Sequence, residues 1–198
     1  IAQKHELGWI IISSASEKLG WSKIKLSKRK KEINEIRELL KIKKKNFFSL
    51  DFETSTLSDS SFEALVSSLK SALDLFQPNE VFIPSLSDAH SDHRIVFDAA
   101  SSCCKPFRLK SIKKVLSYET ISESNFYLDR KSSFNPNYFE DISPYLGKKI
   151  EAMKIYKSEM GQFPFPRNKK TIEAQAIFRG SFVNFKAAEA FELLLNRD

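Results

Sequence analysis

The chain has 198 residues and a formal net charge of +7, and 41% of its residues are hydrophobic. This apolar content excludes a disordered chain, and the length favours a single domain over residues 1–198. No apolar run approaches the ~20 residues that a membrane-spanning helix needs. The two cysteines, Cys103 and Cys104, are adjacent and form no obvious cross-link, which favours a reducing compartment, by default the cytoplasm.

Strand and helix patterns alternate along the first half of the chain. Residues 1–6 indicate the tail of a helix that ends before Gly8, and a β-branched run at 9–14 suits a buried strand. Apolar residues on one helical face predict an amphipathic helix at 28–42. The other elements expected in this half are a strand at 46–50, a helix at 61–76, a strand at 80–83 and, after a polar loop at 85–92, a helix at 93–103.

The second half of the chain is less regular. Strands are expected at 113–120 and 138–142, and helices at 144–160 and 169–178. The alternation of strands and helices predicts an α/β fold in which helices cover both faces of a mostly parallel sheet, as a Rossmann-like three-layer sandwich. In such sheets ligands bind beyond the carboxyl ends of the strands, which is where the polar loop at 85–92 lies.

Two of the three histidines lie in the polar segment Asp88-Ala-His90-Ser-Asp92-His93-Arg94. Imidazole is a common zinc ligand, and neighbouring carboxylates fix its tautomer, so this segment contains the parts of half a hydrolytic metal site. In the alternative interpretation, Asp88 or Asp92 caps the following helix and the imidazoles form local hydrogen bonds. A catalytic zinc usually takes three protein ligands, so further ligands must come from elsewhere. The third histidine, His5, suits the surface of the opening helix.

The positive charge is concentrated in one segment. Residues 21–46 contain 11 Lys and Arg against 3 Glu, a local charge of +8. Such a segment can attract phosphates, which makes nucleic-acid binding through Lys23 to Lys45 a rival function. However, apolar residues run through the same predicted helix and no aromatic platform accompanies the charges. A solvated outer face explains them better, and no nucleic-acid partner is expected.

A series of segments along the chain points to one known family. Arg29-Lys-Lys-Glu32 is followed by a strand segment at 77–84 and by the histidine segment at 88–98. Later blocks are Tyr156-Lys-Ser-Glu159, residues 163–167, Phe178-Arg-Gly180 and residues 188–191. In this order the segments resemble the bacterial LmbE-like (PIG-L) family of zinc-dependent N-deacetylases, whose members have a His-x-Asp-His segment after a strand. The resemblance spans nearly the whole chain.

The resemblance implies roles for the histidine segment. His93 is expected to be a zinc ligand, and His90 to be the imidazole that stabilises the oxyanion and assists the leaving amine, held by Asp92. The family's His-Pro-Asp-Asp-Glu segment, which supplies the other His and Asp ligands and the general base, does not occur in the chain. The domain is therefore expected to be N-terminally incomplete, with its first strand missing. Where the family commonly has an Asp after the second strand, this chain has Glu53-Thr54-Ser55, which puts one substrate contact in doubt.

Arginine side chains are candidates for holding a sugar conjugate, because guanidinium groups suit hydroxyl, carboxylate and phosphate partners. The resemblance favours Arg29 as a substrate contact, and Arg94 lies within the histidine segment. Arg167 is a further candidate. Arg179 is better explained as facing the C-terminal dipole of a helix that ends near Gly180.

The activity implied by the resemblance is zinc-dependent hydrolysis. One zinc ion per subunit would activate water to remove an N-acetyl group from an amino sugar or sugar conjugate, with an imidazole stabilising the oxyanion. The expected partner is that small molecule, and an oligomer is possible. The alternatives are a non-catalytic sugar-binding relative or an inactive fragment, and the sequence upstream of Ile1 would distinguish them.

Overall fold

The computed structural model describes residues 5–124, 126, 128 and 133–197 of the chain. The helix tail expected at residues 1–6 therefore lies largely outside the described residues. Within these described ranges, no helix is both long enough and apolar enough to cross a membrane.

Two parallel strands form the first of two sheets. β1 (Trp9–Ser14) and β2 (Phe47–Glu53) pair along their lengths, and the helix α1 (Lys23–Leu39) lies between them in the chain. α1 begins earlier than the apolar spacing predicts, because Ser22 caps its first turn by accepting a hydrogen bond from the Lys25 N–H.

The second sheet has the strand order β3-β4-β6-β5. β3 (Glu80–Pro84) and β4 (Lys114–Tyr118) are parallel, whereas β6 (Ala188–Asn196) runs antiparallel to both β4 and β5 (Tyr138–Asp141). The expected single, mostly parallel sheet is therefore divided. Within the part of the chain that the structure describes, one edge of β1 and one edge of β3 have no paired strand.

The strand β6 was not predicted as a strand from the sequence. Its residues are mostly Ala, Glu and Leu, which favour helices, and it lacks the alternation of a half-buried strand. It forms a strand because it lies between β4 and β5 and pairs with both. Tertiary pairing overrides local propensity at this point.

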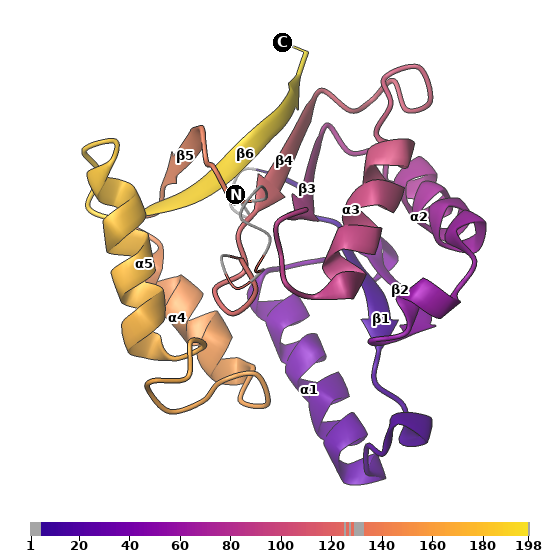
Figure 1. Cartoon of the computed structure of the whole chain (residues 1–198), viewed down its shortest axis with the longest axis horizontal. Coiled ribbons are helices and arrows are strands. Elements are labelled where there is room, and N and C mark those ends of the chain that lie inside the picture. Colours follow the sequence, from indigo (N-terminus) through magenta and orange to yellow (C-terminus); the bar gives the residue numbers. More distant parts are fainter. Residues whose placement is uncertain (1–4, 125, 127, 129–132, 198) are drawn as a thin grey trace.

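Helices cover both sides of the strands. Figure 1 shows α2 (Phe62–Phe76) and α3 (Ser91–Cys103) on one side, and α4 (Leu146–Ile155) and α5 (Lys169–Ser181) on the other. The three-layer arrangement expected from the sequence is thus confirmed. Buried residues of α2, α3, β3 and β4 form the main core, against which β1 and β2 also pack; they include Leu65, Leu69, Leu73, Ile83, Ala99, Cys103, Ile112 and Val115.

The C-terminal ends of α4 and α5 differ from the expected ones. α4 ends at Ile155, and the residues after it turn toward α1 instead of continuing the helix. α5 continues through Gly180 to Ser181. A Cβ atom at Gly180 would lie 2.6 Å from the main-chain oxygen of Phe185, so glycine allows the following turn to pack closely against the helix.

Candidate metal and catalytic site

The histidine segment lies at the carboxyl end of β3, where the chain enters α3. Several contacts hold this loop in one conformation. Asp88 forms an isolated β-bridge with Ser124, and the Arg94 guanidinium donates hydrogen bonds of 2.8 and 2.7 Å to the main-chain oxygens of Asp88 and Ala89. Arg94, an expected substrate contact, therefore supports the loop from within the protein.

His93 is oriented by a buried carboxylate. Its Nδ1 lies 2.7 Å from Oδ2 of Asp88, whose side chain is fully buried. The other carboxylate oxygen of Asp88 accepts a hydrogen bond from the Ser124 hydroxyl. A carboxylate can only accept, so Nδ1 carries the proton and the Nε2 lone pair of His93 is free for a metal ion.

His90 is held in the opposite tautomer. It is the N-cap residue of α3, and its Nδ1 accepts a hydrogen bond of 3.1 Å from the Asp92 N–H. Neutral His90 therefore carries its proton on Nε2 and can donate it. The rings of His90 and His93 stack with centroids 5.1 Å apart. One imidazole can thus offer a lone pair and its neighbour a proton.

The carboxylate of Asp92 contacts the turn after β2. It is buried and accepts hydrogen bonds from the main-chain N–H groups of Ser55, at 2.7 Å, and Leu57, at 3.4 Å. This differs from the expectation that Asp92 holds the imidazole of His90, to which it contributes its main-chain N–H. The Asp92 side chain instead ties the start of α3 to the carboxyl end of β2.

Arg29 and Glu32 both contact the turn after α4. Arg29 forms an ion pair with Glu159 and stacks its guanidinium over the Tyr156 ring, 5.3 Å from the centroid. Glu32 is buried and accepts hydrogen bonds from the main chain and hydroxyl of Ser158. The Arg29 guanidinium is therefore held by protein groups, although it was expected to contact substrate.

The two remaining arginine candidates also bind protein groups. Arg167 donates to the main-chain oxygen of Glu159 and to the Ser122 hydroxyl, at 2.9 Å each. Arg179 forms two hydrogen bonds, of 2.8 and 2.7 Å, with the carboxylate of Glu119. The expectation that Arg179 faces a helix dipole before a glycine cap is wrong, because α5 continues and the guanidinium pairs with Glu119.

Two further residues at the site were not singled out from the sequence. Ser124 contacts Asp88, and Tyr118 lies at the carboxyl end of β4. Burial, and then the negative charge of Asp88, raise the pKa of the Tyr118 phenol to about 12. No local sequence signal could have identified either residue, because only the pairing of β3 with β4 and the bridge at Asp88 bring them to the histidine loop.

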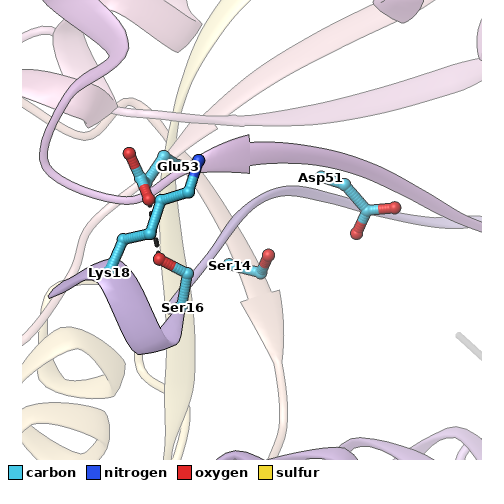
Figure 2. Close-up of a pocket in the computed structure, with 5 residues that line it drawn as sticks. All are labelled: Ser14, Ser16, Lys18, Asp51 and Glu53. Carbon is cyan, nitrogen blue, oxygen red and sulfur yellow. Dashed lines mark hydrogen bonds between the residues drawn. The ribbon is translucent and has the colours of Figure 1, made fainter. Parts of the chain in front are cut away.

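A polar pocket opens at the carboxyl ends of β1 and β2. Figure 2 shows Ser14, Ser16, Lys18, Asp51 and Glu53 around a space of about 300 Å³. The Ser16 hydroxyl donates a hydrogen bond of 2.6 Å to Glu53, and the Lys18 side chain extends toward Glu53, whereas Asp51 points away from this pair. Asp51 has a φ of 55°, at an irregularity in the pairing of β1 with β2. A bulge of this kind redirects side chains at a strand end.

The described residues fit one ligand of a metal site. His93 has a free Nε2 and a carboxylate on its other nitrogen, which is the usual arrangement of a zinc-bound histidine. Within the described ranges, no three His, Cys, Asp or Glu side chains come together to hold a metal ion. Any further ligands must therefore come from outside this group of residues.

Solved deacetylase structures share the fold of the chain. A Pyrococcus horikoshii N,N'-diacetylchitobiose deacetylase is 20% identical, with a TM-score of 0.71 over 96% of this chain and 73% of its own. A conserved protein from Thermus thermophilus is 21% identical, with a TM-score of 0.73 over 98% and 84%. A deacetylase of teicoplanin biosynthesis is 16% identical, with a TM-score of 0.64 over 87% and 75%.

A family match identifies the chain more directly than these folds do. No curated protein sequence matches the chain significantly. The PIG-L family, described as GlcNAc-PI de-N-acetylase, matches residues 1–104, which include α1, the polar pocket and the histidine loop. This match covers more than half of the 198 residues. The chain therefore belongs to the PIG-L family of N-deacetylases.

Proposed function

We propose that this protein is a zinc-dependent hydrolase that removes an N-acetyl group from an amino sugar or sugar conjugate. The observation that carries the proposal is the pair of imidazoles at the end of β3. Asp88 fixes the proton of His93 on Nδ1, while the Asp92 N–H fixes that of His90 on Nε2. Two stacked imidazoles in opposite tautomers suit one metal ligand and one proton donor.

His93 would be one ligand of the zinc ion, through Nε2. When bound, zinc activates water and polarises the acetamide carbonyl. The buried carboxylate of Asp88 would keep the His93 ring in the ligating orientation and increase its basicity.

The remaining ligands would come from residues outside those the structure describes. Two features support this. The family resemblance assigns them to a segment on a strand, and the unpaired edges of β1 and β3 leave room in the pairing scheme for a parallel strand between the two sheets. Such a strand would end near the histidine loop, because parallel strands place their carboxyl ends at one edge of the sheet.

His90 would act on the reacting amide. Its Nε2–H would donate to the oxyanion that develops as the amide carbonyl is attacked, and the protonated ring would then assist the leaving amine. Asp92 would contribute by positioning, since its N–H fixes the His90 ring and its carboxylate anchors the start of α3.

The substrate would be a small N-acetyl sugar. The polar pocket beside β1 and β2 supports this, because hydroxyl, ammonium and carboxylate groups suit sugar hydroxyls. The names of similar structures add support, since they include a deacetylase of diacetylchitobiose and one bound to teicoplanin. Because Arg29 and Arg94 are held by protein groups, we assign them positioning roles around the substrate.

A cytoplasmic location would agree with the cysteines. Cys103 and Cys104 are both free and buried, which suits a reducing compartment.

The proposal is tested by measuring acetate release from N-acetylglucosamine and N,N'-diacetylchitobiose by the full-length protein. We expect release that stops after treatment with a chelator and returns when zinc is added. Sugar binding without acetate release in the zinc-loaded protein would support the non-catalytic alternative and contradict the proposal. Release that persists without any metal would also contradict it.

A further inference from the structure

The segment at residues 18–31, which we call the basic tip, carries seven Lys and Arg and no Asp or Glu. It comprises the turn after β1 and the first half of α1. Figure 1 shows this end of α1 at the foot of the molecule, on the far side from the chain's C-terminus. The charge that stands out in the sequence is therefore concentrated on one projecting part of the surface.

Most of the basic tip's charge is not neutralised by the protein. Arg29 pairs with Glu159, and Lys31 lies 3.8 Å from Glu35. The other basic residues are exposed and, within the described ranges, form no ion pair with a carboxylate; they are Lys18, Lys23, Lys25, Lys28 and Lys30. Their positive field points into solvent.

Helix stability does not explain these lysines. The amino end of a helix carries a partial positive charge, so acidic residues favour it and basic residues oppose it. The first turn of α1 contains Lys23 and Lys25 and no acidic residue. The sequence thus places cations where they weaken the helix slightly, which indicates a role for them outside the fold.

Apolar side chains lie among the lysines. Ile24 is 82% exposed, more than Leu75, the next most exposed aliphatic residue on a helix, at 77%. Leu19, in the turn before α1, is 37% exposed, and Trp21 between them is half-buried. An exposed isoleucine flanked by lysines on both sides is the composition of a helix that lies at a membrane interface.

We propose that the basic tip docks on the surface of an anionic lipid bilayer. The lysines would contact lipid headgroups, and Ile24 and Leu19 would enter the boundary with the acyl chains. A nucleic acid would satisfy the lysines only, because its phosphates offer nothing to an exposed aliphatic side chain. The bilayer is therefore the partner that fits both features.

Docking is separate from the proposed chemistry, because it needs neither zinc nor a sugar. Lys18 belongs both to the basic tip and to the polar pocket, so a docked protein would hold this pocket close to the lipid surface.

The test is co-sedimentation of the purified protein with phosphatidylcholine vesicles that contain about 30% phosphatidylserine, against phosphatidylcholine alone. We expect binding to the anionic vesicles only, and its loss at about 1 M salt, which shortens the range of the lysine field. Absence of binding to anionic vesicles at low salt would overturn the proposal.

Matched variants separate the two parts of the basic tip. Replacing Lys23, Lys25 and Lys28 together by Ala should weaken vesicle binding about 100-fold, since each surface lysine contributes about fivefold. Ile24→Ser should weaken it about tenfold through lost apolar contact. The control variants remove equal charge or apolar surface elsewhere and should change binding less than about twofold; they are the triple Ala variant of Lys41, Lys44 and Lys45, and Leu75→Ser.

Two outcomes of these variants would contradict docking at the basic tip. One is an equal loss in the triple control variant, which would indicate general charge attraction. The other is binding of an oligonucleotide that depends on the three lysines but not on Ile24, with weak vesicle binding, which would assign the surface to nucleic acids. Unchanged circular dichroism and thermal midpoints would establish that each variant is folded.

Discussion

Asp88 and His93 form the central contact of the site, with the fully buried carboxylate 2.7 Å from Nδ1 of the imidazole. Asp88→Asn should weaken zinc binding by the full-length protein about 10- to 100-fold, because the ring loses its charged orienting partner. Competition with a chromophoric chelator measures this. The exposed Asp98, on the helix that contains His93, supplies the control, Asp98→Asn, which should keep the original affinity. Equal affinities in both variants would exclude this role for Asp88.

Asp92 should contribute more to stability than to chemistry. Asp92→Ala removes the acceptor of the Ser55 and Leu57 N–H groups, so we expect the free energy of unfolding to fall by about 1–3 kcal/mol. Urea denaturation gives this value, and Asp98→Ala should change it by less than about 0.5 kcal/mol. A stable Asp92→Ala variant would mean that the turn after β2 finds other partners.

The Arg179–Glu119 ion pair joins α5 to the end of β4. Because the Glu119 side chain is only 5% exposed, Arg179→Ala leaves a buried, unpaired charge and should cost about 3–5 kcal/mol of unfolding free energy. Replacing both residues by apolar ones, Arg179→Met with Glu119→Leu, should recover most of the loss. Lys70→Ala, which breaks the exposed pair with Asp74, should cost less than about 1 kcal/mol. Equal losses in the two single variants would contradict this reasoning.

The two adjacent thiols should be unreactive in the folded protein. Burial raises the pKa of Cys103, and burial together with the neighbouring Cys103 raises that of Cys104 to about 12. Both remain protonated at neutral pH, so iodoacetamide should label them only after unfolding. Mass spectrometry with and without urea measures this, and rapid labelling of the native protein would refute it.

The same thiols make stability depend on pH. The folded pKa values lie above those of the unfolded chain, about 8.5, so the contribution is fully present below that pH. It should decrease as the pH rises from there toward the folded value of about 12. Urea midpoints that increase between neutral and strongly alkaline pH would have the wrong sign.

Much of the fold could be predicted from the sequence because its strands and helices have distinct periods. The run at β1 and the apolar stripe of α2 gave both elements close to their observed positions. β6 and the division of the sheet were not predicted, since both depend on which strand edges meet. The helix-forming composition of β6 becomes strand only between β4 and β5.

The site was predictable to the same extent. His90 and His93 could be found because they are close in sequence and follow a strand. Their tautomers could not be, because these depend on hydrogen bonds from Asp88 and the Asp92 main chain. The internal roles of Arg29 and Arg94 were also hidden, since a guanidinium that suits a sugar suits a carboxylate or carbonyl equally well.

The division of roles between His93 and His90 is tested most directly by zinc content and acetate release in two variants of the full-length protein. His93→Ala should lose both zinc and activity. His90→Ala should retain zinc but release acetate about 100-fold more slowly or worse, because it lacks the oxyanion donor. Full zinc content and full activity in His93→Ala would contradict the account.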